Sequence, residues 1–384
     1  MTNRPKTSGT PPTPANLAAL AFVREKAVRE HRRAIVRAQA ALGAVSDVAE
    51  LCAAVRRVGV VTLNFHPDRL LADGRSVAEA LYEEGAYRNQ FESGISNGGL
   101  APFQGSFRDG WEKAMFGGAY HAAGVQNWER PKYGGLNLMN LSNGACPRFG
   151  SCHLRLTEAA LDRCTFFFGD SAGSPNDGGV IDAFESVVAG LLESLARNPE
   201  ALGRCDVTLP GFVDAALRAG SPDELLPPAQ SHELDNYIET QVHGAVALHE
   251  DVAALVIDPS FAGAETGEVL IRAAERHDFP VEWNAGLTLT VADIPTEVPS
   301  GDPRRWRSFC AEGRAARLGA RVAASYARDG KHLDAAAIGQ AAASVVRHPS
   351  GWQEWGPTAD ALTCLKDLWL ILVFYGKPAS NPAD

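Results

Sequence analysis

Short strand-like runs are confined to the middle of the sequence, and they do not alternate strictly with helical segments. The runs are rich in β-branched and aromatic residues and are bounded by turn-forming residues, as is typical of strands. They comprise GVVTLNFH at 59–66, YGGLNLMNL at 133–141, SCHLRL at 151–156 and CTFFFGDS at 164–171. A doubly wound parallel sheet requires strands and helices to alternate. The sequence therefore predicts an α+β fold with a mixed, mainly antiparallel β core and helices at both ends.

Composition changes along the chain and indicates its organisation. The Pro-, Thr- and Ser-rich start is expected to lack structure. An Ala-rich stretch with helical spacing follows it, and a Pro- and Gly-rich stretch at 295–303 is typical of a linker. We expect a tail at 1–15, helices at 16–57, an α+β catalytic domain at 58–295 with an insertion near 199–231, and a helical region at 300–384.

Charge and cysteine usage narrow the class of protein. The formal net charge is −10, which disfavours non-specific binding to nucleic acid. The seven cysteines contain no CxxC pair, so the sequence indicates neither a disulfide framework nor a zinc site. The longest apolar run, LWLILVFY at 368–375, is too short to span a bilayer. We expect a soluble cytoplasmic protein with no membrane partner and no metal.

Polar side chains gather on the strand-like runs. His66 ends the first run and Tyr133 opens the second. A later run, YIETQVHG at 237–244, places four polar residues on one face because strand side chains alternate: Tyr237, Glu239, Gln241 and His243. Such a face is solvated in many sheets. The density of polar residues and glycines between the runs favours a binding site instead.

Gly-rich and basic loops lie between these runs. FESGISNGG at 91–99 contains Ser96 and Asn97, and its glycines would let backbone N–H groups approach a ligand. Taken alone, such a loop is more often a surface turn. Arg130 and Lys132 precede the second run, and Arg148 precedes the third. The sequence has no GxxxxGK[ST] or GxSxG motif, which disfavours a P-loop nucleotidase and a serine hydrolase.

The order of these residues resembles the ADP-ribosyltransferase superfamily. His66 on a first strand, the short helix and glycine of SVAEALYEEG, Tyr133 on a later strand and Glu239 in ETQVHG are similar to its poly(ADP-ribose) polymerase-like and toxin-type branches. The resemblance covers about residues 58–291 and implies a split β-sheet. The whole chain also resembles an uncharacterised bacterial family that is defined only as a domain of unknown function.

The resemblance implies cleavage of NAD at the bond between nicotinamide and ribose, followed by transfer of ADP-ribose to a macromolecule, or hydrolysis. Glu239 would stabilise positive charge on the ribose, His66 would hold the other ribose and Tyr133 would stack on nicotinamide. Gln241 would orient the ribose or the acceptor. The implied cofactor-binding residues are Arg69, Ser96, Asn97, Arg130, Lys132, Arg148 and Ser151.

Other hypotheses stay open. Pro67 follows His66 where the family has glycine, so it has no N–H to offer the nicotinamide. Arg69 and Ser151 allow a competing Arg-Ser-Glu alignment with Glu239. A toxin-type hydrolase or nuclease could use His and Asp side chains as acids, bases or metal ligands: His66, His153, His243, Asp68 and Asp170. The Arg-rich C-terminal helices could instead form a non-catalytic protein-interaction module.

Overall fold

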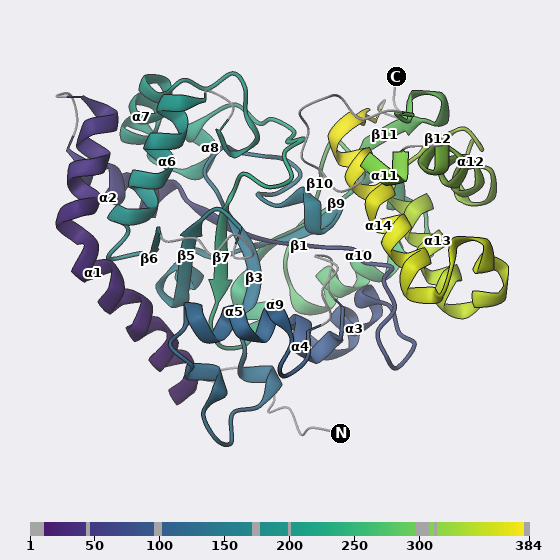
Figure 1. The fold of residues 1–384 in the computed structure, drawn as a ribbon, viewed down its shortest axis with the longest axis horizontal. Helices are drawn as coiled ribbons and strands as arrows, with labels where there is room; N and C mark the ends of the chain where they lie inside the picture. The colour runs from purple at the N-terminus through teal and green to yellow at the C-terminus, as the bar shows by residue number, and fades with distance from the viewer. Residues whose placement is uncertain are drawn as a thin grey trace.

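The computed structural model describes residues 11–43, 47–95, 102–170, 177–198, 201–296, 307–310 and 313–379 (Figure 1). The expected linker at 295–303 lies almost entirely outside these ranges, as do Ser96 and Asn97. Within the described ranges, no helix is both long enough and apolar enough to cross a bilayer.

The fold is an α+β arrangement, as expected, with helices before and after the sheet. The helices that precede and surround the sheet are α1 (Pro14–Leu42), α2 (Val48–Val58), α3 (Val77–Glu84), α4 (Gln90–Ser93), α5 (Phe107–Met115), α6 (Glu185–Arg197), α7 (Leu209–Arg218), α8 (Pro222–Leu225), α9 (Leu248–Asp251) and α10 (Glu265–His277). Those of the C-terminal region are α11 (Arg307–Cys310), α12 (Arg314–Tyr326), α13 (Ala335–Arg347) and α14 (Thr358–Tyr375).

Helix α1 begins at Pro14, inside the stretch that was expected to lack structure. The Thr13 side chain accepts a hydrogen bond from the Asn16 backbone N–H, and the Asn16 side chain accepts one from the Thr13 N–H. This reciprocal cap, with proline in the first helical position, fixes the start of the helix. Helices α1 and α2 pack against α6 and α7 on one side of the molecule, opposite the C-terminal helices (Figure 1).

In the described part of the chain, eight strands form the central sheet, in the order β10-β9-β4-β1-β3-β7-β5-β6. Their bounds are β1 (Val60–Phe65), β3 (Lys132–Asn137), β4 (Cys152–Leu156), β5 (Cys164–Phe168), β6 (Gly178–Val180), β7 (Ile238–Val242), β9 (Val252–Ile257) and β10 (Val281–Trp283). Neighbouring strands are antiparallel except β9 and β10, which are parallel. The expected runs at 59–66, 133–141, 151–156 and 164–171 each contain a strand of this sheet, which confirms the mainly antiparallel core.

Smaller sheets join distant segments. They consist of β2 (Ala86–Tyr87) with β8 (Val246–Ala247), and of β11 (Leu287–Thr290) with β12 (His332–Leu333) and β13 (Lys377–Pro378). The sequence VEWNAGLTLTV at 281–291 predicts one further strand, and that prediction is wrong. A turn at Gly286, whose φ is +62°, separates β10 in the central sheet from β11 in the small sheet. Glycine adopts this left-handed conformation without steric penalty.

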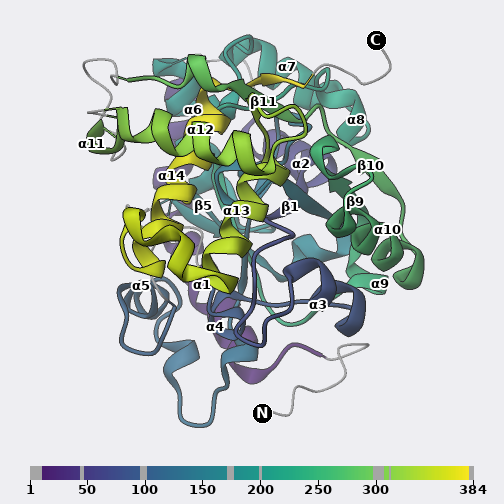
Figure 2. The same cartoon turned by 90° about the vertical axis from the view of Figure 1, so that its right-hand side faces the viewer.

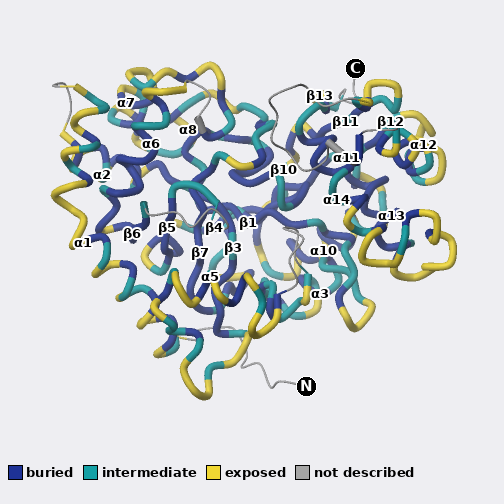
Figure 3. The backbone as a smooth tube through the Cα atoms, viewed as in Figure 1, coloured by how far each residue is buried: buried dark blue, intermediate teal, exposed yellow. Residues whose placement is uncertain are grey.

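One face of the central sheet is apolar and packs against helices. Leu63, Leu136, Leu154, Phe166 and Ile238 are buried there in the main hydrophobic core. The buried backbone runs through the centre of the molecule, while the outer sides of α1 and α12 are exposed (Figure 3). The C-terminal helices pack into the same hydrophobic core. Figure 2 shows α12, α13 and α14 next to one another on the side that faces the viewer.

Candidate functional site

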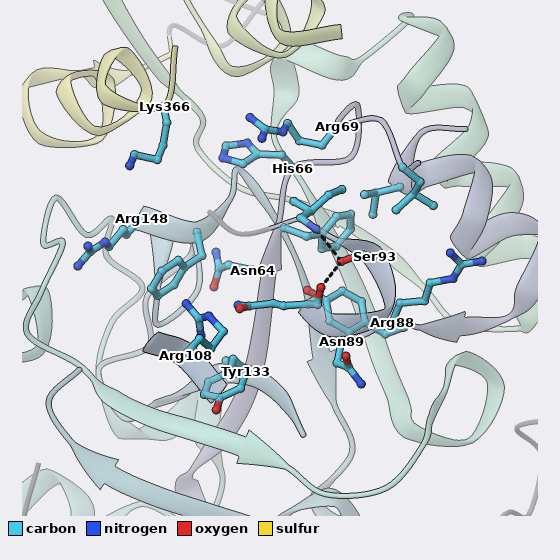
Figure 4. Close-up of a pocket in the computed structure, with 18 of the residues that line it drawn as sticks. Asn64, His66, Arg69, Arg88, Asn89, Ser93, Arg108, Tyr133, Arg148 and Lys366 are labelled. Carbon is cyan, nitrogen blue, oxygen red and sulfur yellow. Dashed lines mark hydrogen bonds between the residues drawn. The ribbon is translucent and has the colours of Figure 1, made fainter. Parts of the chain in front are cut away.

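A cavity of about 440 Å³ opens beside the end of β1 (Figure 4). Strands β1, β3 and β7 contribute to it, together with residues of α3, α4, α5 and α14. Six residues that the sequence analysis singled out line this cavity: His66, Arg69, Tyr133, Arg148, Asp170 and Glu239. The candidate residues of the His-Tyr-Glu pattern therefore meet in one place although 173 positions separate the first from the last.

Strand order explains why these residues meet. Strand β3 lies between β1 and β7, with Tyr133 opposite Gln241 and Gly135 opposite Glu239. Directly paired residues of antiparallel strands point to the same face, so Tyr133, Gln241 and Glu239 share one face of the sheet. His66 follows the last residue of β1, where the chain turns at Pro67.

The polar face of β7 is buried rather than solvated. Tyr237, Glu239, Gln241 and His243 are each at most 4% exposed. Gln241 Nε2 donates a hydrogen bond of 2.7 Å to Glu239 Oε1, and the Tyr237 hydroxyl lies 3.5 Å from Glu239 Oε2. A buried carboxylate needs such donors to offset the loss of water. Gln241 does not line the cavity; it holds a residue that does.

Tyr133 presents its ring to the cavity and its hydroxyl to the protein. The hydroxyl donates a 3.0 Å hydrogen bond to Glu112 Oε1, and the Arg108 guanidinium lies 5.4 Å from the ring centroid. Glu112 in turn forms an ion pair with Arg130. Burial raises the pKa of Glu112, while Arg130 opposes the shift. The ring is thus fixed at both its edge and its face (Figure 4).

His66 is an uncharged ring at neutral pH. Burial, with a smaller contribution from Arg69, lowers the pKa of His66 to about 3. Its ring lies edge-on to Trp369 of α14, with centroids 4.9 Å apart. A neutral imidazole can donate one hydrogen bond and accept another, as contact with a ribose hydroxyl requires. The next residue, Pro67, has no N–H, and its carbonyl accepts a 2.8 Å hydrogen bond from Ala78.

Cationic side chains dominate the charge of the cavity wall. Arg69, Arg88, Arg108, Arg148 and Lys366 line it, against Asp170, Glu239 and Asp367. Arg148 pairs with Asp170 and Asp235, and Arg88 pairs with Glu84. Arg69 and Arg108, by contrast, form no ion pair with a carboxylate in the described part of the chain. Two guanidinium groups are therefore available to an anionic ligand.

Three expected cofactor-binding residues lie outside the cavity. Arg130 forms 2.6 Å ion pairs with Asp109 and Glu112. Lys132 is fully buried and donates to backbone carbonyls, including that of Gly244 at 2.8 Å. Ser151 is also buried, and its carbonyl accepts from Asn284. These groups stabilise the surroundings of the site and are not placed to contact a ligand in the cavity.

Other lining residues escaped the sequence analysis. Arg108 comes from α5, and Lys366 comes from α14, just before the apolar run at 368–375. Asn64 lies on β1 and donates hydrogen bonds to the carbonyls of Asn143 and Gly150. These bonds hold the loop that carries Arg148 against the site. A polar Asn in the buried run VVTLNF was the signal for Asn64; Arg108 and Lys366 have no comparable local signal.

The residues of the alternative hydrolase hypothesis are dispersed. His66 and Asp170 line the cavity, whereas His153 and His243 do not. Burial lowers the pKa of both latter rings to about 3. In the ranges that the structure describes, no three His, Cys, Asp or Glu side chains form a group that could hold a metal ion. The described residues therefore give the metal form of this hypothesis no support.

Comparison with known families places the chain in a wider group. Residues 60–375 match the sequence model of a family described as Protein of unknown function (DUF3626). The chain belongs to this family. The DUF3626 match runs from β1 to the end of α14, so it includes every residue that lines the cavity, but not α1. No curated protein matches the chain.

Proposed function

We propose that this protein binds NAD in the cavity and cleaves the bond between nicotinamide and ribose, as an ADP-ribosyltransferase-like enzyme. The observation that carries the proposal is the convergence of His66, Tyr133 and Glu239, from the ends or middle of three neighbouring strands, on one cavity. This is the set of residues that the resemblance singles out for the reaction.

The chemistry needs one well-placed carboxylate. As the glycosidic bond breaks, nicotinamide leaves with the bonding electron pair and positive charge develops on the ribose. A fixed carboxylate stabilises that charge more in the transition state than in bound NAD. Glu239 is held by Gln241 and faces the cavity, so we assign it this role. An acceptor nucleophile, or water, then attacks the ribose carbon and loses its proton.

The cationic wall fits the rest of the NAD molecule. A pyrophosphate carries two negative charges, and guanidinium groups bind phosphate oxygens through paired hydrogen bonds. Arg69 and Arg108 line the cavity, and neither forms a salt bridge in the described ranges, although Asp68 and Glu112 interact with them electrostatically. Tyr133 offers a ring face for stacking, and the neutral His66 offers hydrogen bonds to a ribose. Its successor Pro67 removes one backbone donor, so the carboxamide of nicotinamide must be held by other groups.

Nicotinamide release tests the proposal. The wild-type protein and Glu239→Gln would be incubated with NAD, and free nicotinamide would be measured by liquid chromatography. We expect the variant to lose activity by about 100-fold or more, because the amide keeps the shape and removes the charge. Glu158→Gln, an exposed glutamate elsewhere, is the matched control and should behave as wild type.

The same reaction mixture distinguishes transfer of ADP-ribose from hydrolysis of NAD. Mass spectrometry of added proteins would show whether ADP-ribose is transferred or released to water. Calorimetry should detect NAD binding by wild type and by Glu239→Gln, because this substitution leaves the cationic wall intact. Absence of nicotinamide release from wild type, together with absence of NAD binding, would contradict the proposal.

A further inference from the structure

A buried line of side chains leads from Glu239 away from the cavity to the first turn of α1. Each member is less than 5% exposed, and each is hydrogen-bonded to the next. The distances are 2.7 Å from Glu239 to Gln241, 2.7 Å from Gln241 to Thr165, 3.0 Å from Thr165 to His243, 2.5 Å from His243 to Tyr120 and 3.1 Å from Tyr120 to Asn16. We call these six residues the relay.

The hydrogen positions in the relay follow from its end at Glu239. The Gln241 Nε2 donates to Glu239 Oε1, so the amide group of Gln241 that faces the carboxylate is the NH₂. The Gln241 carbonyl then faces Thr165 and must accept the Thr165 hydroxyl hydrogen. Because that hydroxyl has no second hydrogen, it must accept one from His243 Nε2. At each step only one placement of the hydrogen satisfies both partners.

The same argument fixes the tautomer of His243. Burial, together with the nearby charges of Lys132 and Arg163, lowers the pKa of His243 to about 3, so the ring carries one hydrogen. With Nε2 protonated, Nδ1 accepts from the Tyr120 hydroxyl. The Tyr120 oxygen in turn accepts from Asn16 Nδ2.

The far end of the relay is also fixed. Asn16 Oδ1 accepts from the Thr13 backbone N–H in the cap of α1, and Nδ2 also donates to the Glu129 carbonyl at 2.7 Å. The Asn16 amide can therefore not flip without losing these bonds. All five hydrogen bonds of the relay point toward Glu239, and hydrogen bonds aligned in this way polarise one another.

We propose that the relay is a positioning device that fixes the carboxylate of Glu239 from the start of α1, through Tyr120, His243 and Thr165. This inference rests on the proposed function of Glu239. It assigns a role to α1, which lies outside the region matched by the family. Tyr120, His243 and Thr165 are positioning residues, because none of them lines the cavity.

Thr165 is the point at which to break the relay. Thr165→Val keeps the shape and removes the hydroxyl, whereas Thr165→Ser keeps the hydroxyl and removes a methyl group. We expect Thr165→Val to lower kcat for nicotinamide release about tenfold with little change in KM, and Thr165→Ser to restore most of it. Loss of a transition-state contact lowers kcat in this way, whereas loss of uniform binding raises KM.

Thr240 supplies the matched control. It lies on β7 beside Gln241 and is fully buried, and its hydroxyl has no hydrogen-bond partner in the described part of the chain. Thr240→Val should therefore keep wild-type kcat. Equal losses in Thr165→Val and Thr240→Val, or a failure of Thr165→Ser to recover activity, would show that Thr165 acts only through packing and would overturn the proposal.

A second measurement does not need turnover. Spectra of ¹⁵N-histidine-labelled protein, assigned with a His243→Gln variant, should show His243 as the Nε2–H tautomer without titration from about pH 5 to 8. The Nδ1–H tautomer, or titration in that range, would overturn the relay. The expected tautomer in a protein that releases no nicotinamide would leave the relay intact and contradict the proposed function instead.

Discussion

Two buried carboxyl groups, those of Glu239 and Asp68, differ in their hydrogen bonding. Glu239 accepts from Gln241, whereas neither carboxylate oxygen of Asp68 has a hydrogen-bond partner in the described ranges. Asp68 follows Pro67 and lies against α13, where a Cβ on Gly339 would overlap its carboxylate. Burial raises the pKa of Asp68 to about 7, and the backbone N–H of Asp68 itself and the charge of Arg69 only partly oppose this shift. A neutral carboxyl group is the form that this environment favours.

Asp68 should therefore make stability depend on pH. The folded state keeps the proton up to about pH 7, whereas an unfolded Asp loses it near pH 4. Stability should fall as the pH rises through that window and stay lower above it. We expect Asp68→Asn to gain roughly 3–4 kcal/mol relative to wild type between pH 4.5 and pH 8.5, measured by urea unfolding at both values.

An exposed aspartate provides the comparison. Asp223→Asn changes the same chemical group on the surface of α8 and should leave the pH dependence of unfolding as in wild type. An Asp68→Asn variant whose stability ran parallel to wild type across this pH range would contradict the assigned protonation state.

Among the elements, the loop between β3 and β4 depends on one close contact. Gly150 passes so near the end of β1 that a Cβ at this position would lie 2.0 Å from the Phe65 carbonyl carbon. The three nearest atoms all belong to the Phe65 backbone, which leaves little room for adjustment. The loop also carries Arg148 and Phe149 to the cavity wall. Close packing of glycine against β1 therefore sets the position of this wall.

Gly150→Ala should push the loop away from β1. We expect a loss of about 1–3 kcal/mol in the free energy of unfolding, the usual result of overpacking, together with weaker NAD binding by calorimetry. Gly351→Ala is the control, because a Cβ there would meet no atom within 4 Å. Equal stability of the two variants would mean that the loop can relax without cost.

The elements themselves could largely be predicted from local patterns. The helix of SVAEALYEEG forms as expected, because Ser76 and Glu79 make a capping box and Gly85 ends it in a left-handed conformation. The prediction of one strand at 281–291 was wrong because the alternation of apolar and polar residues continues through the turn at Gly286. The two halves of this run join different sheets, and partner choice depends on contacts far along the chain.

At the scale of the whole molecule, the C-terminal region contributes to the site. Helix α14 provides Thr363, Lys366 and Asp367 to the cavity wall. Strand β11, before the expected boundary near 300, pairs with β12 and β13 beyond it. The family match also crosses that boundary. Helix α14 of the C-terminal region therefore helps to form the cavity.

Lys366 should contribute to ligand affinity from this distant segment. Its side chain extends from α14 toward the cavity (Figure 4). We expect Lys366→Ala to raise KM for NAD about tenfold through loss of attraction to the phosphates, with kcat nearly unchanged. Steady-state kinetics would measure both, with the exposed Lys331→Ala as control. A selective fall in kcat would place Lys366 at the reacting bond instead.

The candidate site could be predicted only where strands position it. His66, Tyr133 and Glu239 belong to runs whose pairing brings them together, and alternation along β7 indicated the shared face of Glu239 and Gln241. Arg130 and Lys132 lie close to Tyr133 in sequence, yet internal partners hold them away from the cavity. Arg108 and Lys366 reach it through helix packing, which no local pattern specifies.

The direction of the hydrogen bonds in the relay also restricts how this sequence can diverge. Each of the three middle side chains donates one hydrogen bond and accepts one: Thr165, His243 and Tyr120. A replacement that exchanges donor for acceptor at one of these positions reverses or breaks the bonds on both sides. Descendant sequences should therefore tolerate such replacements only in compensating pairs, and this constraint should extend to Asn16, far upstream of the strand it serves.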